Sequence, residues 1–109
     1  MKVIQKGHTV ILKETEASLV EFIEKITNQC KTFEKQNIIL DLSNFSVEIN
    51  ELALFEKLAK SHKKAKKSLI IVTNSIDFEL VPKYLVVVPT LLEAHDMIEM
   101  DEIERDLGF

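Results

Sequence analysis

Apolar residues occur along this chain in short runs and in longer periodic stripes. Two β-rich runs, Lys2–Gln5 and Thr9–Leu12, lie on either side of Gly7, so the pattern predicts an opening hairpin whose turn uses the conformational freedom of glycine. Three later runs are almost continuously apolar, which is typical of strands covered on both faces. They are residues 37–42 (NIILDL), 68–73 (SLIIVT) and 85–88 (LVVV).

Periodic stripes between these runs predict helices. Apolar residues at steps of three and four predict a helix from Leu19 to about Lys35, with a capping box of Ser18 and Glu21 at its start. A second amphipathic helix follows the run at 37–42. Its apolar stripe consists of Leu52, Phe55, Leu58, Ala59 and His62.

The last third of the chain predicts an irregular segment, a strand and a final helix. Residues 76–83 hold at most a short helix before Pro82, because proline cannot continue one. Thr90 and Glu93 form a second capping box, which opens a helix to about Glu99. Residues 101–107 add a last turn or two.

Strands that alternate with helices form parallel sheets with right-handed crossovers, and the opening hairpin makes such a sheet mixed. We therefore expect an α/β fold, with a mixed, mainly parallel sheet of about five strands flanked by helices. The chain of 109 residues suits one domain over residues 1–109.

Composition narrows the class of protein. Gly7 and Gly108 are the only glycines, too few for a phosphate-binding loop or a dinucleotide fingerprint. The single cysteine, Cys30, cannot form an internal disulfide, and on a predicted buried stripe without a neighbouring histidine it is expected to be an inert thiol. No apolar run reaches the ~18–20 residues that cross a bilayer, and no basic-then-apolar leader begins the chain. We expect a cytoplasmic protein with no membrane segment.

The segments IILDLS (38–43), KKSLIIVTNS (66–75) and LVVVPTLLEAHDMI (85–98) occur in this order with an amphipathic helix between the first two. This arrangement resembles the STAS domain, the fold of bacterial anti-sigma-factor antagonists, and the resemblance covers nearly the whole chain. In that family a late strand leads into a capped helix that begins with an E-A pair, here Glu93 and Ala94. The resemblance implies a STAS-like fold and a domain that binds another protein.

The resembling family carries an Asp-Ser-Ser-Gly motif after its D-L-S strand, and a serine there is phosphorylated by a partner kinase. The matching residues 48–54 (EINELAL) contain neither serine nor glycine, so Asn50 or Glu51 takes the acceptor position and the usual switch is lost. Glu51 suits a helix start as a capping or first-turn residue, or as a fixed charge that mimics phosphorylation. Ser43 and Ser46 remain nearby as possible phosphorylation sites. The resemblance implies a partner surface at these four residues.

The closing residues VVVPTLLEAHDMIEMDEIERDLGF are similar to those of small bacterial proteins that carry the name ribonuclease Z. The true enzyme holds two zinc ions with an H-x-H-x-D-H cluster and further His and Asp ligands. This chain has three histidines, His8, His62 and His95, and none lies within two residues of another. We therefore expect a non-enzymatic protein with no catalytic residues, no metal and no cofactor.

Three further candidate sites each have a structural alternative. His95 and Glu99 form an i, i+4 pair, but two ligands do not close a metal site. His62 ends an apolar stripe and is expected to pack rather than to act as a base. Asp41 and Ser43 end the central strand at the carboxyl edge of the sheet, where open α/β sheets bind small molecules. Both side chains also suit hydrogen bonds to loop amides.

The formal charge of −4 is unevenly distributed. Residues 57–67 contain six lysines, whereas residues 93–106 carry seven carboxylates. Helical spacing places a basic face on the second helix, formed by Lys57, Lys60, Lys63, Lys64 and Lys67, with Lys66 beside it. This face could be solvated, or it could bind phosphates or an acidic partner, including the acidic tail of a second copy. It contains no aromatic residue, so base stacking with single-stranded RNA gains no support.

The residues favour a non-catalytic, regulatory domain that binds another protein. The alternative is an accessory protein in RNA processing, which would bind nucleic acid or a ribonuclease through the basic face at 57–67. The acidic balance argues mildly against nucleic acid as the main partner, and a homodimer is a further possibility.

Overall fold

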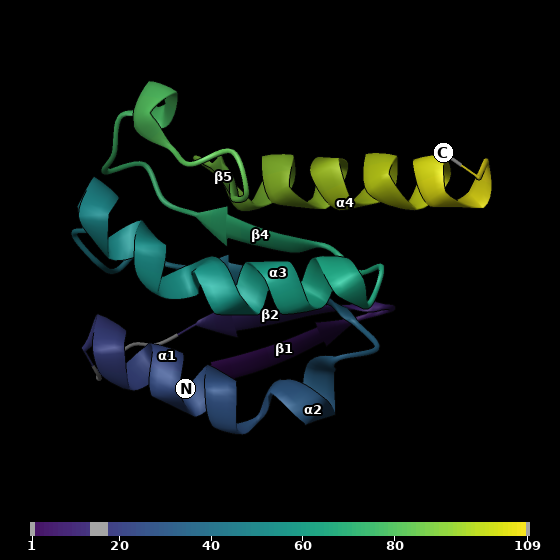
Figure 1. Ribbon diagram of the computed structural model, residues 1–109, viewed down its shortest axis with the longest axis horizontal. Helices are drawn as coiled ribbons and strands as arrows, with labels where there is room; N and C mark the ends of the chain where they lie inside the picture. The colour runs from purple at the N-terminus through teal and green to yellow at the C-terminus, as the bar shows by residue number, and fades with distance from the viewer. Residues whose placement is uncertain (1, 14–17, 109) are drawn as a thin grey trace.

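Five strands form one sheet, in which they lie in the order of the chain. The computed structural model describes residues 2–13 and 18–108. The strands are β1 (Lys2–Lys6), β2 (Thr9–Lys13), β3 (Asn37–Asp41), β4 (Leu69–Val72) and β5 (Val86–Val88). β1 pairs antiparallel with β2, and each later pair is parallel. The predicted mixed, mainly parallel α/β sheet is thus confirmed (Figure 1).

Gly7 turns β1 into β2, as the pattern predicts. Its φ is +58°, a left-handed backbone conformation that glycine adopts without steric penalty. The register pairs Lys6 with Thr9 across a two-residue turn. The hairpin therefore rests on local turn chemistry that can be identified in the sequence.

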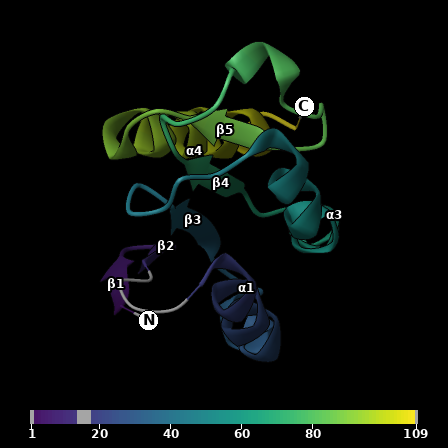
Figure 2. The ribbon, with the colours of Figure 1, turned by 90° about the vertical axis from the view of Figure 1, so that its left-hand side faces the viewer.

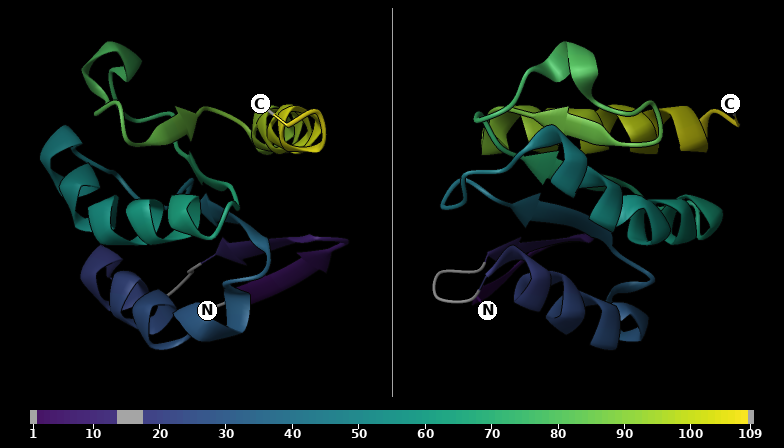
Figure 3. Two further views of the ribbon diagram at one scale, coloured as in Figure 1. Left: turned by 45° about the vertical axis from the view of Figure 1, so that its right-hand side comes forward. Right: turned by 60° about the vertical axis from the view of Figure 1, so that its left-hand side comes forward.

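Helices cover the two faces of the sheet unequally. One face carries α1 (Leu19–Asn28), α2 (Cys30–Phe33), the 3-10 helix η1 (Ile49–Phe55), α3 (Glu56–Lys64) and the 3-10 turn η2 (Phe78–Leu80). Within the described residues, the other face carries α4 (Leu91–Asp106) alone. Figures 2 and 3 show α1 and α3 on one side of the sheet and α4 on the opposite side.

Two helix starts have the caps that the sequence predicts. The Ser18 hydroxyl accepts a hydrogen bond from the N–H of Glu21 at the start of α1. The Thr90 hydroxyl accepts one from the N–H of Glu93 at the start of α4. Such caps satisfy N–H groups that have no partner within the helix, and each contributes about 1 kcal/mol to stability.

The helices also depart from the predicted pattern in three details. The expected helix from Leu19 to about Lys35 breaks at Gln29, whose N–H bonds to the Ile26 carbonyl at 3.0 Å and tightens the last turn of α1. The second helix begins as η1, a 3-10 segment, before it becomes α3. The last helix is one continuous element of 16 residues and does not end near Glu99.

The core divides into two clusters, one on each face of the sheet. The larger packs α1, η1 and α3 on the sheet and includes Phe22 and Phe55, both fully buried. The smaller packs Ala94 and Ile98 of α4 on Ile39 and its neighbours. β3 is buried along its whole length, as predicted for a strand covered on both faces, whereas β5 at the sheet edge is half-buried.

Two expectations concern the chain as a whole. Among the described residues, no helix has the length and apolar character needed to span a membrane. The expectation of an inert thiol at Cys30 lies outside the described part of the molecule, since the structure describes only the backbone of this residue.

Candidate functional site

The carboxyl ends of β3 and β4 meet at one edge of the sheet, and the side chains there hold loops in place. Asp41 is buried, its Oδ1 accepts a hydrogen bond from the Ser43 N–H at 3.0 Å, and its Oδ2 lies 3.7 Å from the Lys13 ammonium. The carboxylate is therefore engaged in loop and strand contacts. The structure supports the structural alternative for Asp41 rather than a small-molecule site.

The loop after β3 is fastened to the loop after β4. Ser75 Oγ accepts a hydrogen bond from the Val47 N–H at 3.1 Å and donates one to the Val47 carbonyl at 3.3 Å. The Oγ1 of the buried Thr73 lies 3.1 Å from the Ser75 hydroxyl. Phe45 stacks on Phe22 with ring centroids 6.1 Å apart, which anchors the loop to the core. The loop conformation is thus fixed by both polar and apolar contacts.

Glu51 lies at the start of η1 and completes a capping box. Its Oε1 accepts a hydrogen bond from the Glu48 N–H at 3.0 Å, and the Glu48 side chain accepts one from the Glu51 N–H. The capping role expected for Glu51 is confirmed. Its carboxylate is thus hydrogen-bonded to the backbone at the helix start.

The predicted partner-binding residues come together at this edge of the sheet. Ser43, Ser46 and Asn50 are exposed, and Glu51 is half-buried beside them. The backbone segments η1 and η2 lie at the same end of the molecule, where β3 and β4 finish (Figure 1), and they carry the exposed apolar residues Leu54, Phe78 and Leu80. We define the carboxyl-edge surface as Ser43, Ser46, Asn50, Glu51, Leu54, Phe78 and Leu80.

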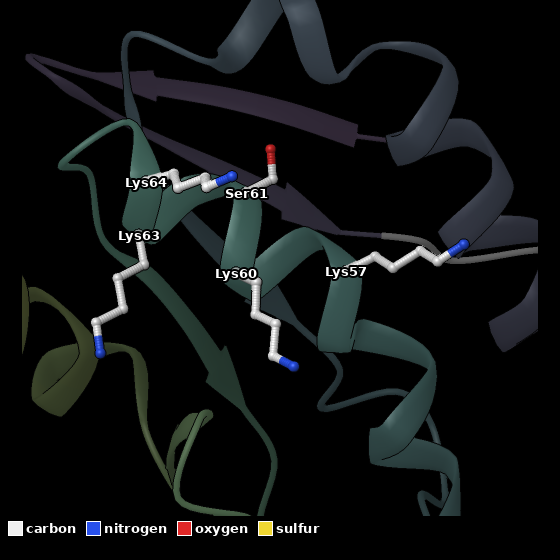
Figure 4. Close-up of a pocket in the computed structure, with 5 residues that line it drawn as sticks. All are labelled: Lys57, Lys60, Ser61, Lys63 and Lys64. Carbon is white, nitrogen blue, oxygen red and sulfur yellow. The ribbon is translucent and has the colours of Figure 1, made fainter.

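The predicted basic face is present on α3, but its ammonium groups diverge. Lys57, Lys60, Lys63 and Lys64 are exposed and, with Ser61, line a shallow pocket of about 730 Å³. Figure 4 shows Lys57 and Lys64 extending to one side, whereas Lys60 and Lys63 extend to another. Because the charges do not converge, the pocket does not present a single anion-binding point.

Two lysines have specific local roles. Lys60 pairs with Glu56 at 2.6 Å and lies 5.6 Å from the centre of the Tyr84 ring, and the Glu56 hydrogen bond raises the pKa of Lys60. Lys67 does not continue the face of α3, which corrects the prediction. The helix ends at Lys64 because Lys66 adopts a left-handed φ of +60°, which sends Lys67 into the connection to β4.

A groove of about 630 Å³ lies at the last turns of α3 and α4. It is lined by Lys63, Lys66 and Lys67 of the predicted basic region, by Lys83 and Arg105, and by the acidic Asp101 and Glu104. The Arg105 guanidinium donates to the Lys66 carbonyl at the end of α3. Cations at helix C-termini offset the partial negative charge of unpaired carbonyls, so this basic character has a structural cause.

His62 is a packing residue, as predicted. Its Nε2 donates to the Gln36 carbonyl at 2.7 Å, and the ring is 7% exposed. Burial lowers the pKa of His62, the hydrogen bond to Gln36 opposes this shift, and the charge on Lys67 adds to it. Burial therefore favours the neutral form of the ring, and its Nε2 is occupied in a structural contact.

We expect the free energy of unfolding to fall as the pH drops below about 6.5, the pKa of an unperturbed histidine. Because the pKa of His62 is lower in the folded chain, the unfolded chain binds a proton at a higher pH than the folded chain does. The contribution of the neutral ring to the free energy of unfolding is therefore complete above that pH and is lost as the pH falls below it. Urea denaturation across pH 5–8 measures the effect. His62→Gln should flatten this pH dependence, whereas His8→Gln, in the exposed turn after Gly7, should preserve it.

The described histidines and acidic residues lie apart from one another in the fold. Among residues 2–13 and 18–108, no group of three His, Cys, Asp or Glu side chains is placed to hold an ion. His95 is half-buried and Glu99 exposed on α4, so their pair has no third ligand in this part of the chain.

Two features of the site were not predicted from the sequence. Thr73 and Ser75 follow β4 closely, and their position after an apolar run is a signal that they would face the loop after β3. Phe78 and Leu80 lie in residues 76–83, for which the sequence predicts at most a short helix, so nothing there marked them as exposed apolar residues.

No protein-family model matches the chain, and a search of curated proteins finds no match either.

Proposed function

We propose that this chain is a non-catalytic domain that binds another protein through the carboxyl-edge surface. The observation that carries the proposal is the exposure of three large apolar side chains, Leu54, Phe78 and Leu80, on short elements beside the polar residues 43–51. Apolar side chains that a fold holds toward solvent, with polar residues around them, are typical of protein interfaces.

The backbone behind this surface is held in place before any partner binds. Ile76 and Val81 pack on the larger core cluster, while Phe78 and Leu80 between them point outward. The hydrogen bonds between Ser75 and Val47 join this segment to the loop after β3. A surface with little conformational freedom to lose binds with a smaller entropic penalty.

The resemblance to STAS domains supports the same location. In that family the helix start after the central strand contacts the partner and carries the phosphorylated serine. Here Asn50 and Glu51 stand in that position, and Glu51 is part of a capping box. We therefore propose constitutive binding, with Ser43 and Ser46 as the hydroxyls through which a kinase would regulate it. We place the protein in the cytoplasm, where its single cysteine would stay reduced.

The first experiment captures partners on the immobilised full chain from native cytosol, identifies them by mass spectrometry and titrates the purified partner. We expect a protein whose affinity falls by less than about 10-fold between 50 and 200 mM salt, because apolar contacts are not screened. Nucleic acid held by four lysines of α3 should instead lose roughly 100-fold over this range. That steep salt dependence, with RNA as the captured species, would overturn the proposal.

A further inference from the structure

α4 presents apolar side chains on two opposite sides. Ala94 and Ile98 face the sheet and are buried. The opposite side carries a row of exposed apolar residues within about a quarter of the helix circumference. We call this row the outer stripe: Leu92, Met100, Ile103 and Leu107, of which Leu92 is 72% and Ile103 53% exposed. A helix that is apolar on both sides is typical of one packed between two layers.

The sheet has a complementary uncovered region on the same face. α4 packs over β3, β4 and β5, and no other described helix lies on this face. Figures 2 and 3 show β1 and β2 beside the strands that α4 covers, with no described helix over them on this face. Alternation along the paired strands places Lys2, Ile4, Lys6, Ile11 and Lys13 on this side. Ile11 is buried in the cluster with Ala94 and Ile98, so the part left uncovered, which we call the open sheet face, is Lys2, Ile4, Lys6 and Lys13.

The two surfaces carry opposite charges. The exposed side of α4 is acidic: Asp96 lies within the outer stripe, between Leu92 and Met100, and Glu99 and Asp106 flank the stripe on one side. The open sheet face carries exposed lysines at Lys2 and Lys6, while Lys13 is paired with Asp41 in the same molecule. The acidic, partly apolar side of α4 therefore has a basic surface around the half-buried Ile4 as its match.

We propose that a second copy of this chain covers this face, so that each α4 lies over the open sheet face of its partner. The two α4 helices would run antiparallel, side by side, between two sheets. α4 lies over β4, and the middle of β1 and β2 is two to three strand spacings away, roughly 12 Å. Packed helices lie about 8–10 Å apart, so a second helix fits beside the first.

Two-fold symmetry satisfies both surfaces at once. Each copy supplies one outer stripe and one open sheet face, so a closed dimer leaves neither uncovered. The alternative, in which α4 contacts the lysines on α3 of a neighbour, joins opposite faces of the sheet, so it is a head-to-tail contact that would build rings or open chains rather than a two-fold dimer. Ile103 and Leu107 are exposed and do not belong to the carboxyl-edge surface. The closed dimer would bury both side chains.

Sedimentation equilibrium of the full chain at micromolar concentrations tests the proposal. The chain mass is 12.5 kDa, so we expect a species of twice that mass, about 25 kDa. A monomer over the whole concentration range would overturn the proposal, and so would masses that keep rising beyond the dimer.

Ile103→Lys should weaken the dimer at least 10-fold, because it buries a charge in the apolar centre of the interface. Val20→Lys is the matched control, since Val20 is 56% exposed on α1 and lies on the opposite face of the sheet. Both positions are solvent-exposed, so the circular dichroism spectrum and the melting temperature should stay close to those of the parent. Lys6→Glu should weaken the dimer from the other surface. A dimer that both Ile103→Lys and Lys6→Glu leave intact would contradict the proposed interface.

Discussion

Replacing Phe55 by alanine is expected to lower the free energy of unfolding by about 3–5 kcal/mol. Phe55 is fully buried at the junction of η1 and α3, where it joins the larger core cluster. Its removal costs the transfer energy of the ring and leaves a cavity. Small domains are stable by about 5–15 kcal/mol, so a large part of the stability would be lost. Urea denaturation at constant pH measures the difference.

Leu54→Ala is the control for this experiment, because Leu54 precedes Phe55 in the same helix and is exposed. It should change stability by less than about 0.5 kcal/mol, as exposed substitutions usually do. Equal losses in the free energy of unfolding for Phe55→Ala and Leu54→Ala would show that η1 does not bury the side that carries Phe55.

Replacing Leu80 by aspartate should weaken binding of the captured partner at least 10-fold. The side chain is 62% exposed on η2, so its apolar surface is free to be buried by a partner, and a carboxylate there would have to be desolvated. The melting temperature should stay within a few degrees of the parent because Leu80 contributes nothing to the core. Isothermal titration calorimetry gives the affinity.

Val20→Asp serves as the matched control for Leu80→Asp. Val20 has a similar exposure and lies on α1, away from η2. It should bind the partner with unchanged affinity. If both variants bind equally well, the partner does not contact η2, and the lysines of α3 become the leading candidate surface.

The fold could be predicted largely because its signals are local. Continuous apolar runs predict β3 and β4, and the caps at Ser18 and Thr90 predict the starts of α1 and α4. The length of α4 was harder to predict. Apolar residues on opposite sides of a helix cancel the periodic signal by which an amphipathic helix is recognised. The exposed Met100 and Ile103 therefore obscure the buried stripe of α4.

The candidate site could be predicted only in part because its members meet through the sheet. Residues 43–51 were found because they follow one strand within a single stretch of sequence. Ser75 fastens Val47 from 28 residues away, and that contact depends on the parallel pairing of β3 with β4. The end of α3 was misplaced because the left-handed backbone of Lys66 has no signature in the side chain.

Amide hydrogen exchange of the full chain, with and without the captured partner, tests the proposed binding surface most directly. We expect slower exchange on binding in residues 43–51 and 76–81, the two segments that form the carboxyl-edge surface and its supports. Exchange in residues 57–64 of α3 should not change. Protection confined to α3, with residues 43–51 and 76–81 unaffected, would contradict the proposal that this chain binds its partner at the carboxyl edge of the sheet.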